Sequence, residues 1–316
     1  MKKIICFLLT LTFFACSACS NSKQKAANEA VSSIKVGSGP EDLNYMERSG
    51  ALLGPECFSI KSDGGFYLLD TAKNRILSFD SSGKKDDSFK LPDDLSVVKI
   101  SVGPDDRLYV LDASKGIIGT VESENIIRYQ ISSLMIEPLI DFGITKSNIP
   151  YIVLADQEGG QSYLFKLENQ SANIIEIKKG RLTPEEKIYK TLLIKEKGYE
   201  IGHACIMQIY DFNNKLENEL LIESENWLVG ASYLGEEDDQ IIVQTHETDS
   251  DTDKANYNDL VKKINKDGKI AEISILPQKY KYISNDTVQK GSSLYHLNTG
   301  EHEVTLEKLN FVSADS

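Results

Sequence analysis

The sequence predicts an all-β fold built from repeated four-stranded units. Short apolar segments alternate with turns rich in Ser, Asn, Asp and Gly, which is the pattern of β-hairpins. The same pattern returns along the chain at intervals of 42 to 54 residues. A period of about 40–50 residues is typical of propellers and other repeat architectures. Two strand elements recur within each period.

The first recurring element is a strand that ends at an apolar residue and runs into a polar turn. In the best-preserved copy, residues 75–84 have the sequence RILSFDSSGK. The last apolar residues of successive copies are Phe79, Val121, Leu167, Tyr210 and Ile264. They are separated by 42, 46, 43 and 54 residues, and one further period leads to Leu309. These positions define six units, which we number 1 to 6.

The second recurring element is the strand that precedes the first one within a unit. Its copies are FYLLD (66–70), LYVLD (108–112), YIVLA (151–155), IIVQT (241–245) and LYHLN (294–298). Each copy follows a turn such as SDGG or GPDD. A single pair of such strands would be an ordinary hairpin, so the prediction depends on the repetition.

Six four-stranded units predict a six-bladed β-propeller over residues 33–313. The last unit is one strand short, and SIKVG (33–37) precedes unit 1. We expect this N-terminal strand to supply the outer strand of unit 6, because such closure removes an exposed sheet edge. Unit 4, roughly residues 181–223, is the least clear, and its RLTPEEK segment predicts a loop or a helical turn.

The first 18 residues have the pattern of a bacterial lipoprotein signal peptide. Lys2 and Lys3 precede an apolar run that is too short to span a bilayer core of about 30 Å. The small residues before Cys19 resemble a lipobox, which implies lipidation of Cys19, with Cys16 as the less favoured alternative. A plain secretory signal is the other alternative. Residues 19–32 are polar and predict a flexible tether, so the membrane is an expected partner through the lipid.

Composition narrows the classes of function. The chain has 35 Lys and Arg against 48 Asp and Glu, for a net charge of −13. This acidic balance excludes nucleic acid as a favoured partner. Outside the signal region only Cys57 and Cys205 remain, and both lie in apolar strand-like segments, which predicts two buried free thiols.

Unit 1 resembles the NHL repeat. Pro55 opens its first strand, an Asp-Gly turn follows at residues 63–64, and Asp70 precedes an Asn-x-Arg-like step that carries Asn74 and Arg75. Unit 2 keeps Asp112 but has Gly116 and Ile117 at that step, and the later units keep only the rhythm of strands and turns. The resemblance implies a bacterial lipoprotein with a six-bladed propeller in the cell envelope, on the outer membrane or cell surface if the cell is Gram-negative. Because one fold supports many functions, it implies little about activity.

Five residues are candidates for a binding rim on one face of the ring. Asp70, Asp112 and Asn298 should end second strands there, and Arg75 and His246 lie at the same kind of junction. A structural interpretation competes with this one. In it, Asp70 caps its own turn and pairs with Arg75, and we favour it for that pair.

Metal sites are not predicted. His203, His246 and His302 fall at junctions of neighbouring units that diverge, so they should not converge on one zinc ion. The acidic stretch 247–260 lacks the Gly and Glu that an EF-hand loop needs, and it is interpreted as a solvated insertion.

The sequence therefore predicts a binding or assembly module without a cofactor, for an envelope protein or an extracellular ligand. The alternative is an enzyme, a lyase or hydrolase, with its active site in the axial pocket. Converging His and Asp side chains in that pocket would favour the enzyme, and an apolar or plugged channel would favour the binding module.

Overall fold

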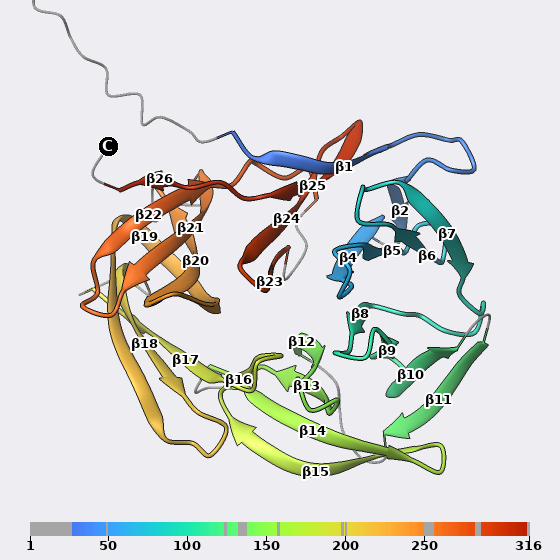
Figure 1. The fold of residues 1–316 in the computed structure, drawn as a ribbon, viewed down its shortest axis with the longest axis horizontal. Helices are drawn as coiled ribbons and strands as arrows, with labels where there is room; N and C mark the ends of the chain where they lie inside the picture. The colour runs from blue at the N-terminus through green and yellow to red at the C-terminus, as the bar shows by residue number, and fades with distance from the viewer. Residues whose placement is uncertain are drawn as a thin grey trace, which may run out of the picture.

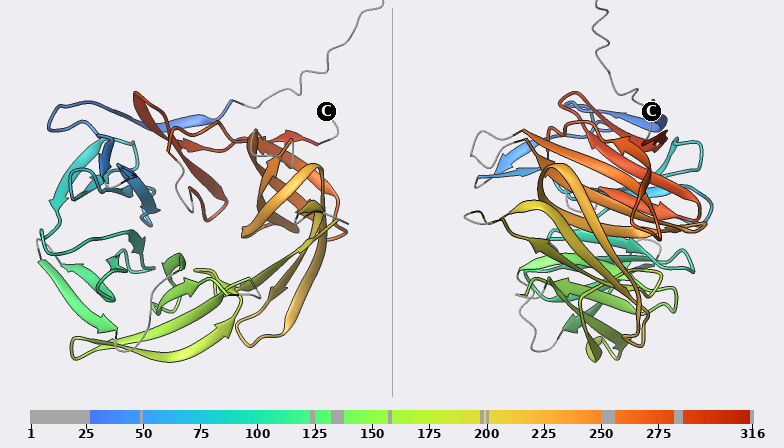
Figure 2. Two further views of the ribbon diagram at one scale, coloured as in Figure 1. Left: turned by 180° about the vertical axis from the view of Figure 1, so that it is seen from behind. Right: turned by 90° about the vertical axis from the view of Figure 1, so that its left-hand side faces the viewer.

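The strands form sheets that stand around one axis (Figure 1), in a ring that is thinner than it is wide (Figure 2). The computed structural model describes residues 27–48, 50–122, 125–131, 138–156, 159–196, 199, 201–249, 256–281 and 286–314. The regular structure of these residues consists of β-strands. This arrangement is a β-propeller, so the predicted propeller class is confirmed. None of the described residues forms a helix long and apolar enough to cross a membrane.

Consecutive strands pair antiparallel within each unit, and the first strand of each lies nearest the axis (Figure 1). The strands of units 1 and 2 are β4 (Pro55–Ile60), β5 (Phe66–Asp70), β6 (Arg75–Phe79), β7 (Lys85–Lys90), β8 (Lys99–Val102), β9 (Leu108–Asp112), β10 (Ile117–Glu122) and β11 (Asn125–Ile131). The strands of unit 3 are β12 (Leu139–Ile144), β13 (Pro150–Leu154), β14 (Gln161–Glu168) and β15 (Ser171–Lys179). A separate hairpin precedes unit 1 and consists of β2 (Met46–Arg48) and β3 (Ala51–Leu53).

Units 4 and 5 share one long strand. Unit 4 contains β16 (Arg181–Leu182), β17 (Ile188–Ile194), β18 (Gly202–Tyr210) and the first part of β19 (Leu216–Glu237). Unit 5 contains the second part of β19 with β20 (Gln240–Thr248), β21 (Tyr257–Asn265) and β22 (Ile270–Ile275). Residues 216–223 of β19 pair with β18, and residues 227–237 pair with β20. The backbone therefore passes from one unit to the next without leaving the sheet.

The two ends of the described chain complete the ring. Unit 6 contains β23 (Thr287–Lys290), β24 (Ser293–Thr299) and β25 (Glu303–Lys308), and β1 (Glu29–Lys35) pairs antiparallel with β25 on its outer side. The hydroxyl of Ser32 in β1 also donates a hydrogen bond of 2.8 Å to the carbonyl oxygen of Gly83 in unit 1. The final strand, β26 (Val312–Ser313), pairs with β22 of unit 5. Both ends of the described chain thus fasten neighbouring units together.

The first strand begins earlier than the sequence predicts. It starts at Glu29 rather than at Ser33, so residues 29–32, expected in the tether, are part of the sheet. These four residues, Glu-Ala-Val-Ser, mix polar and apolar side chains without the alternation of a strand, and the backbone pairing with β25 holds them in the sheet. The rest of the predicted tether and the signal peptide, with Cys16 and Cys19, lie outside the described residues.

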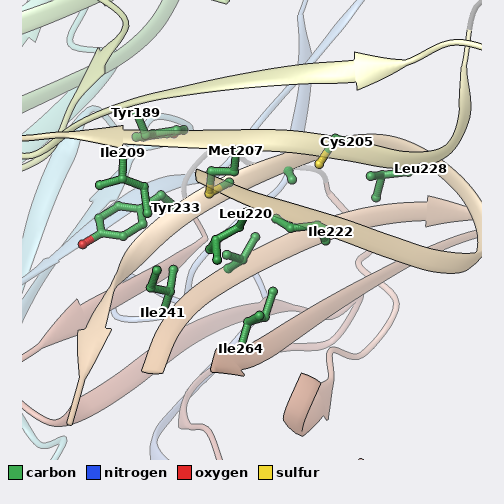
Figure 3. Packing of buried hydrophobic residues seen from close by; sticks show 12 residues of the cluster. Tyr189, Cys205, Met207, Ile209, Leu220, Ile222, Leu228, Tyr233, Ile241 and Ile264 are labelled. Carbon is green, nitrogen blue, oxygen red and sulfur yellow. The ribbon is translucent and has the colours of Figure 1, made fainter. Parts of the chain in front are cut away.

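Apolar side chains fill the space between neighbouring sheets. Between units 4 and 5, one cluster includes Met207, Leu220, Ile222 and Ile264, each at most 3% exposed (Figure 3). Burial of such a side chain stabilises a fold by about 1.5–3 kcal/mol. Cys205 belongs to this cluster and, like Cys57, is a buried free cysteine, as the sequence predicts.

The predicted second strands agree with the structure. FYLLD and LYVLD coincide with β5 and β9, and the other three copies fall on β13, β20 and β24 with shifts of a few residues at their ends. The segment RLTPEEK is neither purely loop nor helical, because it begins with the two-residue strand β16 and continues as a turn. This short strand is the first strand of unit 4, which sequence analysis could not locate.

Candidate functional site

The first strands of the units surround a cavity on the axis. It has a volume of about 510 Å³ and is lined by residues of β4, β8, β12, β16, β19 and β23 with adjoining segments. Because side chains alternate along a strand, every second residue of these strands can face the axis. The ionisable residues among the lining are Lys99, Asp141, Arg181, Glu185, His246, Asp286 and Lys290, together with Cys57, Tyr151, Tyr189 and Tyr233. The channel is therefore polar, and both signs of charge face it.

His246 lies on the wall between this cavity and a second one. The second cavity has a volume of about 600 Å³ and lies over unit 5, where Tyr257, Asp259 and Lys279 line it. His246 contributes to the lining of both cavities, as does Gly230 beside it. A Cβ atom added to Gly230 would lie 3.7 Å from Cδ2 of His246, so it would make ordinary van der Waals contact with the imidazole.

The imidazole of His246 is held by a carboxylate. Its Nδ1 donates to Oδ1 of Asp259 over 2.6 Å, and the other oxygen of Asp259 pairs with Nζ of Lys279. Burial by itself raises the pKa of Asp259, but the bonds from His246 and Lys279 outweigh burial and lower that pKa to about 2. Asp259 is therefore ionised at neutral pH, and it fixes the ring so that Nε2 is left for another partner.

The charge network continues to the axial cavity through Lys279. Its ammonium group also pairs with the buried carboxylate of Asp286, which lines the axial cavity and accepts a 3.1 Å hydrogen bond from Gln244. The two carboxylates raise the pKa of Lys279 against the lowering effect of burial. Nδ1 of His296 lies 3.8 Å from Oδ1 of Asp286. The His296 side chain is fully buried, and this burial lowers the pKa of its imidazole. The network thus joins unit 5 to unit 6 across the interior.

Asp70 and Arg75 meet as the structural interpretation expects. Nε of Arg75 donates to Oδ2 of Asp70 over 2.9 Å, and both side chains are buried. The terminal nitrogens of Arg75 donate to the carbonyl oxygens of Pro40 and Asp42, each over 2.7 Å. The pair therefore ties the end of β5 to the segment that follows β1. Neither side chain lines the axial cavity.

Asp112 and Asn298 are also engaged in local structure. The carboxylate of Asp112 accepts hydrogen bonds from the backbone N–H groups of Ser96 and Lys115 and from the hydroxyl of Ser114. The amide of Asn298 donates to Glu307 on the neighbouring strand over 3.3 Å. Neither residue lines the axial cavity. Of the five candidates, His246 is thus the one that faces it, and ligand binding by the other four stays a prediction.

The remaining histidines lie apart. His203 pairs with Glu196 over 2.6 Å and packs on Trp227, with ring centroids 4.5 Å apart, whereas His302 is exposed in a turn. Within the described ranges, no group of three or more His, Cys, Asp or Glu side chains is placed to hold a metal ion. In the acidic stretch, Asp249 accepts hydrogen bonds from Asn256, and residues 250–255 lie outside the described part.

Sequence analysis missed most of the residues that face the axis. Arg181 and Asp286 of the axial cavity, and Asp259 and Lys279 of the second cavity, come from four separate segments, and none belongs to a recognisable motif. A usable signal existed for Lys99 and Asp141, which are charged residues inside otherwise apolar first strands. A charge in such a position has to face either the axis or a partner.

The comparisons with known proteins give structural likeness without a family. No family model matches the sequence, and no curated protein matches it. Similar solved structures include Kuenenia stuttgartiensis hydrazine synthase (14% identity, 79% of this chain and 76% of that chain, TM-score 0.48). Another is virginiamycin B lyase from Staphylococcus aureus (12% identity, 85% of this chain and 99% of that chain, TM-score 0.44). A third is the Neurospora crassa Pan2 WD40 domain (8% identity, 90% of this chain and 91% of that chain, TM-score 0.46). With TM-scores below 0.5, these likenesses carry no information on the activity of this chain.

Proposed function

We propose that this chain is a lipid-anchored, extracytoplasmic six-bladed propeller that binds a small polar ligand in its axial cavity. The observation that carries the proposal is the cavity of about 510 Å³, to which strands of all six units contribute. Sites for small molecules are usually concave and have volumes of about 300–1,000 Å³. The first strands hold the lining side chains on a rigid frame, which suits a binding site.

The polar lining favours a small ligand over an assembly role. A propeller that served only as a scaffold could fill its channel with apolar side chains. Here Lys99, Arg181, Glu185 and Lys290 reach the cavity from three different units. Charged groups that line a cavity favour a polar occupant over an apolar one, because an apolar occupant would displace the water around them.

Binding can be tested with a variant that fills the cavity. Gly230 lines the cavity, and an added Cβ atom there would make only ordinary van der Waals contact. The ring in Gly230→Phe should therefore occupy the cavity and abolish binding of any axial ligand. Glu225→Phe, at an exposed position on the same strand, is the matched control and should bind normally. The measurement is native mass spectrometry of the protein purified from its own cells, followed by thermal-shift screening of polar metabolites. Equal ligand binding by both variants would overturn the axial site.

The anchor is supported by the lipobox-like sequence, and it requires a separate test. Cells that express the full chain would be grown with an alkyne analogue of palmitate, and the label on the protein would be measured. Cys19→Ser should remove the label, whereas Cys16→Ser should leave it. Loss of label in Cys16→Ser alone would move the anchor to Cys16, and labelling in neither wild type nor variants would exclude the anchor.

Catalysis is the second candidate, and the His246–Asp259 pair favours it. A histidine oriented by a carboxylate and open to a cavity can act as a general base. If the ligand is turned over, His246→Asn should abolish turnover and keep most of the binding. His302→Asn, at an exposed turn, is the control. Full turnover by His246→Asn would exclude this role.

A further inference from the structure

One wall of the axial cavity contains a tyrosine hydroxyl group that is in contact with the cavity. Tyr151 is 1% exposed, and it lines the cavity. Its hydroxyl lies against Gly143, where any added Cβ atom would collide with it, and Gly143 also lines the cavity. This hydroxyl is not one of the fully enclosed polar atoms that lack a partner among the described residues, so it is in contact with the cavity. It can therefore bond to water or to a ligand there.

Arg181 lies on the same wall and has no counter-ion among the described residues. Its Nε donates to the carbonyl oxygen of Gly159 over 2.9 Å, which fixes the side chain and leaves the terminal nitrogens available. The guanidinium carbon lies 5.9 Å from the ring centroid of Tyr189, which also lines the cavity. Arg181 also hydrogen-bonds to the side chain of Tyr189. Both arginine and Tyr151 are hydrogen-bond donors, so the wall presents donors to the cavity.

The charges around the cavity do not exclude an anion. The cations of the lining are Lys99, Arg181 and Lys290, and the carboxylates are Asp141, Glu185 and Asp286. Lys279 pairs with both Asp286 and Asp259, so it is not counted here, and the lining has three cations and three carboxylates. The chain as a whole has a net charge of −13, so the cavity is less negative than its surroundings.

The tyrosine hydroxyl stays protonated under physiological conditions. Burial, with smaller effects from Asp141, Glu185 and Tyr189, raises the pKa of Tyr151 well above its ordinary value. A hydroxyl that keeps its proton can donate to an anion and does not repel it. A guanidinium group complements it, because its planar N–H donors match the two oxygens of a carboxylate.

We propose that Tyr151, Arg181 and Tyr189 form a subsite that binds the carboxylate of a small organic anion in the axial cavity. The proposal rests on the proposed function, because it names the chemical class of the axial ligand. Arg181 supplies the positive charge and a fixed pair of donors. Tyr151 supplies a second donor in contact with the cavity, and Tyr189 packs against the guanidinium.

The test uses three probes of similar size on the mature chain, with affinities measured by isothermal titration calorimetry. They are N-benzoylglycine, its neutral amide, and phenyl phosphate. We expect N-benzoylglycine to bind at least tenfold more tightly than the amide. Tyr151→Phe removes only the hydroxyl and should weaken binding of the carboxylate by about 10- to 100-fold, as expected for a hydrogen bond to a charged group.

The controls separate this subsite from the cavity itself. Tyr163→Phe removes a hydroxyl that bonds to Gln161 outside the cavity, and it should bind N-benzoylglycine like the wild type. Arg181→Met should lose the preference for acid over amide. Equal binding of acid and amide, preference for the phosphate, or full affinity in Tyr151→Phe would each overturn the carboxylate subsite, as would failure of the wild type to bind N-benzoylglycine. The Gly230→Phe experiment decides independently whether the cavity binds any ligand.

Discussion

Removal of the Arg75 side chain should destabilise the propeller more than most single substitutions. In Arg75→Met the apolar stem remains, but Asp70 loses the 2.9 Å bond that neutralises it in a fully buried position. The carbonyl oxygens of Pro40 and Asp42 lose their donors as well. Breaking a buried ion pair by removing one partner costs about 3–5 kcal/mol. At about 2 °C per kcal/mol for a chain of this size, Tm should fall by about 6–10 °C.

The loss of stability in Arg75→Met should depend on pH, and the surroundings of Asp70 determine the direction of this dependence. Burial raises the pKa of Asp70, and in the wild type Arg75 opposes that rise. A carboxyl group whose pKa is higher in the folded chain stabilises the fold below its unfolded pKa and loses that contribution as pH rises through its folded pKa. Without Arg75 the folded pKa rises further, so Arg75→Met should be most damaging at neutral pH and less so in acid.

The assay is urea unfolding followed by the fluorescence of the single tryptophan, Trp227, between pH 4 and pH 8. The double variant Asp70→Asn with Arg75→Met is the control, because it removes the unpaired charge. It should be more stable at neutral pH than Arg75→Met alone. A loss of unfolding free energy below about 1 kcal/mol in Arg75→Met, or a loss that does not depend on pH, would contradict the role of this buried ion pair. So would a double variant whose loss equals the sum of the losses in Asp70→Asn and Arg75→Met.

Three further predictions concern closure, acid sensitivity and the thiols. Gly83→Ala should lower the free energy of unfolding in urea by at least about 1 kcal/mol. Gly83 has a φ of 76°, and an added Cβ atom would collide with the backbone of β1. Wild-type stability of this variant would contradict the close approach of the two segments. Burial raises the pKa of Glu247, but the ammonium group of Lys262, 2.5 Å from its carboxylate, outweighs burial and lowers that pKa. The ion pair therefore stabilises the fold at pH values above the ordinary pKa of a Glu. This stabilisation is lost as the pH falls through the pKa of the folded state. Glu247→Gln should therefore cost about 3 kcal/mol at pH 7 and less in acid, and an equal loss at both pH values would be inconsistent with this pairing. Burial raises the pKa of Cys57 and of Cys205 to about 11. In a chain that starts at residue 20, a thiol reagent at pH 8 should therefore modify these two cysteines only after unfolding. Rapid modification of the native protein would show that the thiols are accessible.

Much of the architecture could be predicted because each unit carries its own local signal. The segments FYLLD and LYVLD are bounded by turn formers on both sides, and hydrogen bonding in the turns fixes where the strands end. Strand β16 was not found because two residues cannot show a period. The extra residues of β1 were missed because their place depends on a partner about 270 positions away, which no local pattern records.

The site was less accessible to sequence analysis than the fold. The pairing of Asp70 with Arg75 could be anticipated, because the two residues flank one tight turn. His246 and Asp259 lie on neighbouring strands, but Lys279 and Asp286 join them through a connection between units. Which side chains face the axis depends on how the sheets tilt around the ring, and that is a property of the assembled molecule.

Strand β19 has a consequence for how the ring opens. Its 22 residues run from the outer edge of unit 4 to the inner edge of unit 5, and both parts are hydrogen-bonded to their neighbours. Elsewhere a connecting loop could act as a hinge, whereas here separation of the two units would break a continuous ladder and expose the apolar cluster between them. We expect the amide hydrogens of these two units to exchange together, as one cooperative block of the ring.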